Sequence, residues 1–279
     1  MHYLLFFLLS FSSFLNGEVR LFDTFLFCNE LDMLELRLAE HDSAVDYFVL
    51  VEGAKTFTGH PKPLFFEKHR ERFAKWKDKI IYLVIQDYPE EMNQKNSSAW
   101  DKEAYGRDFA MAMLEQLCSP NDLVLHSDLD EIVSDDVLLA FKKRDNPAPH
   151  GLTVDFYYYN CNWKKNYLWN RLYIAQYADV KKVGIAKMRS RAGGFPQING
   201  AGWHLSYFMT PEEIVDKIRA FSHTEVNIPK FTNLQKIEEA INSGKDLFDR
   251  RQEDCARATE SDRLPKYIGL LPARYQRTE

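Results

Sequence analysis

Residues 123–133 read LVLHSDLDEIV, and the fold assignment rests on this stretch. It begins with an apolar run, residues 123–126, and passes directly into three carboxylates, Asp128, Asp130 and Glu131. A short apolar run bounded by polar residues predicts a buried strand. The carboxylates would then stand at the carboxyl end of a strand, where open α/β sheets bind their ligands.

On the N-terminal side of this stretch, strand patterns alternate with helical patterns. Apolar runs predict strands at 19–28, 45–51 and 80–85, and helical spacing is found after Asn29, over 65–76 and over 100–118. This alternation predicts an α/β fold with a mostly parallel central sheet flanked by helices.

On the C-terminal side the pattern is less regular. Residues 151–160 and 183–189 are expected to be strands, and Thr210-Pro211-Glu212-Glu213 predicts a capped helix start. The chain is polar from Ser243 onward, and we expect a helical, less ordered tail there. We assign 18–250 to one domain and 251–279 to a polar C-terminal tail.

Composition narrows the classes of function. The chain has 279 residues, 45% of them hydrophobic, which is enough for a sizeable core. Its net charge of −5 gives no overall field that attracts DNA or RNA, so nucleic acid is not an expected partner. The four cysteines show no CxxC spacing, which argues against zinc, and Cys28 and Cys118 are interpreted as core thiols.

The first residues suggest entry into the secretory pathway. Residues 3–15, YLLFFLLSFSSFL, are shorter than the roughly 20 residues that a membrane span needs, but they match the core of a signal peptide. We therefore expect 1–17 to be a signal peptide or short anchor capable of membrane contact; the alternative is a buried first strand. The protein would then be in the ER or Golgi, lumenal or membrane-bound, or secreted. A sequon, Asn96-Ser97-Ser98, is compatible with this location.

The acidic cluster predicts a metal site. Three carboxylates within four residues repel one another, and a divalent cation relieves that repulsion. Mn²⁺ or Mg²⁺ accepts carboxylate and phosphate oxygens together, so Asp128 and Asp130 are the expected metal ligands. The alternative is a solvated acidic turn.

Three further residues are candidates for ligand binding, each with a structural alternative. His204 follows glycines and could bind the metal or a phosphate, or it could be a packed, hydrogen-bonded histidine. Arg107 could bind a diphosphate or pair with Glu103 one helical turn away. Glu52 could hydrogen-bond ribose or uracil, or cap a loop.

These segments together resemble glycosyltransferase family 17, the β-1,4-mannosyl-glycoprotein 4-β-N-acetylglucosaminyltransferase group. The matching residues are FDTF at 22–25, NELD at 29–32, EG at 52–53, TFTG at 56–59, KPL at 62–64, Trp100 with Glu103 and Arg107, SDLDEI at 127–132, GWHLS at 202–206, Phe208, TPE at 210–212 and AFSH at 220–223. The resemblance extends over about residues 19–250.

The resemblance implies a GT-A-type nucleotide-sugar-binding fold, a UDP-GlcNAc donor, a divalent metal and inversion at the anomeric carbon. Asp128 and Asp130 would bind metal and diphosphate, and His204 would be a site residue. The implied acceptor is a mannose-containing glycan such as an N-glycan core, which would receive N-acetylglucosamine in β linkage.

An inverting transfer needs a general base beside the acceptor hydroxyl. Glu131, next to the metal ligands, is the first candidate, and Asp155 on the following strand is the second. The aromatic residues Tyr157, Tyr158, Tyr159, Trp163 and Trp169 could stack on sugars, although some must face the core of an alternating strand.

Two other classes of protein stay open. Clustered aspartates also occur in metal-dependent phosphoester hydrolases and nucleotidyltransferases, but a second metal cluster is not evident in this sequence. The chain could also be a non-catalytic glycan-binding module of the same fold.

Overall fold

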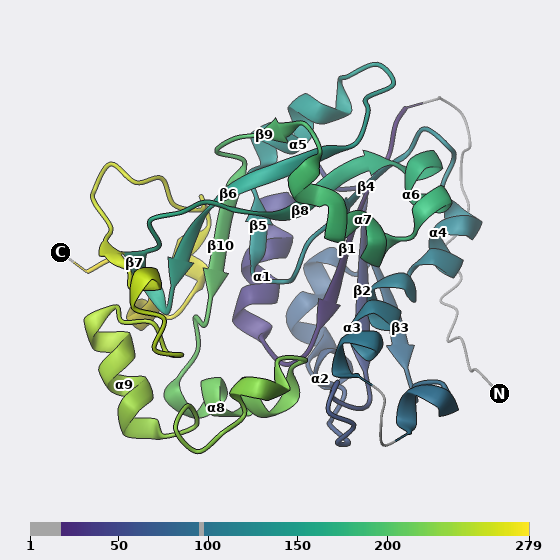
Figure 1. The fold of residues 1–279 in the computed structure, drawn as a ribbon. Helices are drawn as coiled ribbons and strands as arrows, with labels where there is room; N and C mark the ends of the chain where they lie inside the picture. Colours follow the sequence, from purple (N-terminus) through teal and green to yellow (C-terminus); the bar gives the residue numbers. More distant parts are fainter. Residues whose placement is uncertain (1–17, 95–97, 279) are drawn as a thin grey trace.

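The computed structural model describes residues 18–94 and 98–278 as a central sheet with helices around it (Figure 1). The predicted signal peptide or anchor, residues 1–17, and the sequon asparagine lie outside this range. Within it, no helix has the length and apolar character needed to cross a bilayer.

Four parallel strands form the first half of the sheet, as predicted. In spatial order they are β4 (Leu123–His126), β1 (Leu21–Phe27), β2 (Tyr47–Gly53) and β3 (Ile80–Ile85). The connections contain α1 (Leu31–His41), α2 (Phe65–Lys68), the 3-10 helix η1 (Arg70–Trp76), η2 (Glu90–Asn93), α3 (Ala99–Asp108) and α4 (Met111–Leu117). Because the strands are parallel, their carboxyl ends meet at one edge of the sheet.

The second half makes the sheet mixed. β8 (Trp169–Gln176) runs antiparallel to β4 and to β6 (His150–Tyr158). β10 (Gly202–Ser206) lies between β6, to which it is parallel, and the antiparallel β5 (Glu131–Val133). The short strands β7 (Asn160–Lys164), β9 (Gln197–Ile198) and β11 (Ala256–Arg257) complete it.

Three expected elements differ in the structure. The predicted strand over 183–189 is wrong, because α6 (Tyr177–Val183) and α7 (Ile185–Arg191) occupy this region. Gly184, at φ +89°, separates these two helices, and Ile185 and Met188 are buried three residues apart on one helical face. The helical patterns over 65–76 and 100–118 are each divided into two shorter helices.

The C-terminal segment contains no α-helix after α9 (Leu234–Ser243) among the described residues. It continues instead through η5 (Arg251–Glu253), β11, η6 (Ile268–Leu270) and η7 (Ala273–Tyr275). Leu271 and Tyr275 are buried in the main hydrophobic cluster. The expected helical tail is therefore wrong, because these apolar side chains attach the segment to the core.

The remaining helices are α5 (Asp135–Lys142) and α8 (Pro211–Ala220), with the 3-10 helices η3 (Ala192–Gly194) and η4 (Thr224–Val226). The predicted helix start is confirmed, since the Thr210 side chain accepts from the Glu213 amide and Glu213 accepts from the Thr210 amide. Figure 1 shows α8 below β10 and opposite α3.

Hydrophobic clusters cover the two faces of the parallel strands. Phe25 and Leu50 belong to the cluster that includes α1, whereas Phe22 and Val49 belong to the cluster that includes Leu114 of α4. Neighbouring residues of a strand point to opposite faces, so burial of both faces gives the continuous apolar runs seen in the sequence.

Candidate active site

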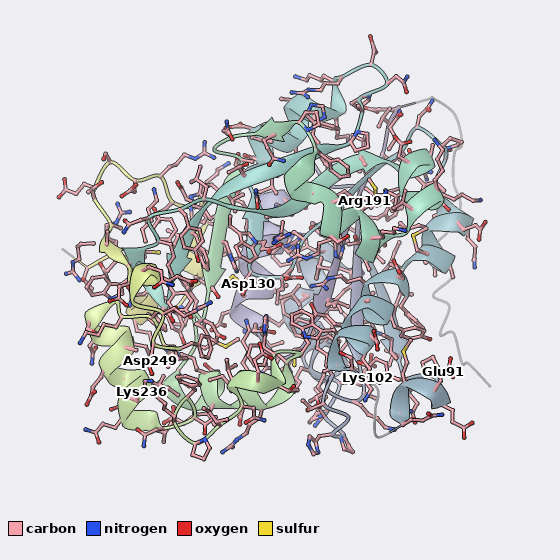
Figure 2. All side chains as sticks on the ribbon, in the orientation of Figure 1. Glu91, Lys102, Asp130, Arg191, Lys236 and Asp249 are labelled. Carbon is pink, nitrogen blue, oxygen red and sulfur yellow. The ribbon has the colours of Figure 1, made fainter. Side chains whose placement is uncertain are left out.

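A cavity of about 840 Å³ opens at the carboxyl ends of the parallel strands. Its lining includes four of the predicted site residues, Arg107, Asp128, Asp130 and His204. In Figure 2 the labelled Asp130 lies in the interior, between the N-terminal and C-terminal parts of the chain. The strand-end location predicted for the acidic cluster agrees with this position.

Asp128 follows β4 and is held by two arginines. Its Oδ1 accepts from Arg107 Nη2 of α3 at 2.9 Å, and its Oδ2 accepts from Arg189 Nη2 of α7 at 2.5 Å. Burial alone would raise the pKa of Asp128, but Arg189 and Arg107 hold it well below its usual range. The carboxylate is therefore ionised and fixed in orientation.

Arg107 also pairs with Glu103 at 2.5 Å, so the helical salt bridge considered from the sequence is present beside the contact with Asp128. Arg189 was not identified from the sequence. The pattern over 183–189 predicts a strand, whereas the structure has the helix α7, which brings this side chain to the acidic cluster.

Glu131 does not line the cavity, because its side chain is fully buried. Arg189 contacts both of its carboxylate oxygens at 2.8 Å, Trp169 Nε1 donates to Oε1, and the Asp128 amide donates to Oε2. With all these donors directed at it, Glu131 has no free oxygen for a substrate proton. The geometry argues against the general-base role expected for it.

Asp130 faces the cavity beside two basic groups. Its Oδ2 lies 3.2 Å from Lys217 Nζ of α8, and its Oδ1 lies 3.6 Å from His204 Nε2. Lys217 also approaches Glu30 at 3.5 Å. Burial alone would raise the pKa of Asp130, but Lys217 and His204 lower it well below its usual range, so Asp130 is ionised.

His204 lies on β10 within an aromatic wall. Its ring stacks on Phe156 at 4.3 Å between centroids and lies 4.9 Å from Trp169. Its Nδ1 is buried without a hydrogen-bond partner among the described residues. His204 therefore both packs against aromatic side chains and lines the cavity.

The side chains at the cavity wall could supply part of the coordination shell of a divalent cation. No group of three or more metal-binding side chains converges in the described part of the chain, since Asp128 turns to Arg107 and Arg189. Asp130 and His204 nevertheless present an oxygen and a nitrogen 3.6 Å apart at the cavity wall. Mn²⁺ and Mg²⁺ need only one or two protein ligands when phosphates and water supply the rest.

Glu52 does not line the cavity and caps a loop instead. Its carboxylate accepts from Lys62 Nζ at 2.9 Å, from the Phe65 amide at 2.6 Å and from Tyr82 Oη at 2.8 Å. The structure therefore shows the loop-capping alternative for Glu52, whose side chain is fully buried beneath the start of α2.

Asp155 also lies outside the main cavity. It is one of the residues around a smaller hollow and pairs with Lys164 at 3.0 Å. Since Asp155 alternates along β6 with cavity-lining Phe156 and Tyr158, its side chain points to the other side of the strand. The structure thus separates the second base candidate from the acidic cluster.

The predicted aromatic residues divide between core and cavity. Tyr158 and Trp169 line the cavity, whereas Tyr157 and Tyr159 are buried and donate to backbone carbonyls. Further lining residues that the sequence did not indicate are Tyr167, Arg171, Arg250 and Glu253. Their common place follows from tertiary contacts, and a local motif does not mark them.

The fold and site define an α/β protein with a ligand cavity at the carboxyl ends of its parallel strands. The chain belongs to glycosyltransferase family 17, whose family model matches residues 10–258. It is 25% identical over 280 aligned positions to the β-1,4-mannosyl-glycoprotein 4-β-N-acetylglucosaminyltransferases of Rattus norvegicus and Homo sapiens. The alignments cover 86% of this chain and 51% of each relative, so the chain spans about half the length of the curated relatives it matches.

Solved structures give more distant likenesses. The mannosyltransferase PcManGT from Pyrobaculum calidifontis, in complex with GDP-Man and Mn²⁺, has a TM-score of 0.41 and 11% identity, covering 80% of this chain and 69% of that one. HddC from Yersinia pseudotuberculosis has a TM-score of 0.37 and 9% identity, covering 67% and 90%.

Proposed function

We propose that this chain transfers N-acetylglucosamine from UDP-GlcNAc, with inversion, to a mannose of an N-glycan. The observation that carries the proposal is the placement of Asp128 and Asp130 in a cavity at the parallel strand ends, in a chain of glycosyltransferase family 17. The names of the curated relatives support the sugar and the acceptor. An enzyme acting on N-glycans would work in the secretory pathway.

In this proposal Asp130 and His204 hold Mn²⁺ or Mg²⁺ together with the donor. Such a cation, when bound, offsets the negative charge that develops on a departing diphosphate. Asp128 contributes a carboxylate whose direction is fixed by Arg107 and Arg189. Lys217 keeps Asp130 charged and adds a positive group at the same wall.

The acceptor would occupy the part of the cavity around Tyr167 and Glu253, before the start of β8. Tyr167 and Trp169 provide aromatic faces there, which suit the apolar faces of sugars. We propose Glu253 as the general base in place of Glu131 and Asp155. It lines this part of the cavity and its side chain is 25% exposed. Its Oε2 accepts from Tyr167 Oη at 3.4 Å and pairs with Arg250 Nη1 at 3.1 Å, so both of these contacts are made by one of its two carboxylate oxygens.

UDP release tests the function. Purified protein is incubated with UDP-GlcNAc and Mn²⁺, with and without an N-glycan acceptor, and then with EDTA. Release that requires both acceptor and metal supports transfer. Phosphate release from simple esters would instead support the hydrolase alternative, and glycan binding without turnover would support the non-catalytic module.

Asp130→Asn tests the cation ligand. The variant keeps the volume of the side chain but removes its charge, so transfer and Mn²⁺ binding should both fall by at least tenfold. Asp136→Asn, at an exposed position on α5, is the matched control and should behave as the unmodified protein. Unchanged Mn²⁺ binding by Asp130→Asn would refute the assignment.

A further inference from the structure

Within residues 18–94 and 98–278, the lysines and arginines that line the cavity form ion pairs, with one exception. The ion pairs are Lys55–Asp87, Lys62–Glu52, Arg107–Asp128, Lys165–Asp246, Arg189–Glu131, Lys217–Asp130 and Arg250–Asp246. Arg171 also lines the cavity and is exposed, but it forms no ion pair with any residue in the ranges 18–94 and 98–278. Its positive charge is therefore available to a ligand.

The strand register puts Arg171 beside the acidic cluster. β8 pairs antiparallel with β4, and His126 faces Tyr173 in this ladder. Asp128 lies two residues after His126, and Arg171 lies two residues before Tyr173. Continuing the register past the end of β4 therefore brings Arg171 level with Asp128.

A second contact holds the backbone at this place. Arg189 Nη1, whose other hydrogen bond goes to Glu131, donates to the carbonyl oxygen of Arg171 at 3.2 Å. Side chains two apart on a strand share a face, so Arg171 points to the same side as Tyr173, which contributes to the cluster that includes α7. Arg189, which is buried, thus helps to fix the position of β8, the strand that carries Arg171.

We propose that Arg171 binds the diphosphate of the nucleotide-sugar donor and the nucleoside diphosphate left after transfer. This inference rests on the proposed function. A guanidinium forms paired, charge-assisted hydrogen bonds to phosphate oxygens. Arg107 and Arg189 direct their charge to protein carboxylates, whereas Arg171, at the same strand ends, has no ion-pair partner in the part of the chain that the structure describes.

Nucleotide binding measured by calorimetry tests the proposal. UDP and UMP, each with Mn²⁺, are titrated into the unmodified chain and into Arg171→Gln, Arg171→Lys and Arg191→Gln. Arg191 is exposed on α7 and does not line the cavity, which makes it the matched control. Figure 2 shows it well away from Asp130.

We expect Arg171→Gln to weaken UDP binding about tenfold, the size of one lost charge-assisted contact. UMP binding should change less, because it lacks the second phosphate. Arg171→Lys should recover part of the loss, since the charge stays but the planar pair of donors does not. Arg191→Gln should bind both nucleotides normally.

Three results would overturn the proposal. In the first, Arg171→Gln folds normally by circular dichroism and binds UDP as tightly as the unmodified chain does. That result would show that the Arg171 guanidinium does not contact phosphate. A loss of UMP affinity as large as the loss of UDP affinity would show that Arg171 does not act on the second phosphate. Absence of UDP binding by the unmodified chain would refute the proposed function and this inference with it, a result distinct from the first two.

Discussion

Arg189 contacts both carboxylate oxygens of Glu131, at 2.8 Å each. The two side chains are almost fully buried, and a third group, the carboxylate of Asp128, completes the cluster at 2.5 Å from Arg189. A buried pair of this kind is held by paired hydrogen bonds whose loss leaves an unpaired charge. The acidic stretch is therefore organised by a helix more than fifty residues away in sequence.

Removing Arg189 should destabilise the fold. In Arg189→Ala the carboxylate of Glu131 stays buried without its cation, which should lower the free energy of unfolding by about 3–5 kcal/mol. Urea denaturation followed by tryptophan fluorescence measures this. Arg191→Ala, on the exposed end of the same helix, should change stability by less than about 0.5 kcal/mol. Equal stability of the two variants would contradict the structural role of Arg189.

Glu253 should affect turnover more than donor binding. Glu253→Gln keeps the side-chain shape but cannot take a proton, so we expect kcat to fall by about 10²–10⁴ with the KM for UDP-GlcNAc nearly unchanged. Glu260→Gln, at an exposed position in the same segment, is the control. If Asp155→Asn shows the large kcat loss and Glu253→Gln does not, the base belongs on β6 after all.

Acid should destabilise the protein through Asp23. Burial alone would raise the pKa of Asp23, but Arg37 at 2.6 Å and His41 at 2.8 Å lower it to about 2. The unfolded value is about 3.9. Because the folded pKa is the lower one, the stabilisation of about 2–3 kcal/mol is complete above about pH 5 and is lost progressively as the pH falls through 2.

Unfolding in urea at a series of pH values measures this dependence. Asp23→Asn should flatten the stability profile between about pH 5 and pH 2, although it will be less stable overall. Asp145→Asn, at an exposed site, should keep the profile of the unmodified chain. An unaltered acid slope in Asp23→Asn would assign the sensitivity to other carboxylates.

Gly202 should not tolerate a side chain. A Cβ there would lie 2.0 Å from the Ile132 carbonyl oxygen and 2.8 Å from Val133 Cα, so β5 and β10 would have to separate. We expect Gly202→Ala to lower the free energy of unfolding by about 1–3 kcal/mol. Gly194→Ala meets no atom within 4 Å and is the control in the same thermal or urea unfolding experiment. Comparable stability of both variants would mean that the strands separate at little cost.

Much of the first half of the fold was predictable. Ile80–Ile85 and Leu123–His126 have the predicted strand limits, because an uninterrupted apolar run bounded by polar residues identifies a strand buried on both faces. The second half was less predictable, and 183–189 was misassigned. That segment is short, and Gly184 interrupts the helical spacing that would have identified it.

The sequence by itself determined the α/β class, the family, and the position of Asp128 and Asp130 at the end of a strand. Tertiary structure alone decided which carboxylates reach the cavity: Asp130 does, whereas Glu131, the next residue, is buried against Arg189. It also gathered Arg171, Lys217 and Glu253 around the same space. The physical reason is that local patterns record burial and periodicity, whereas ion pairs depend on which distant elements the folded sheet brings together.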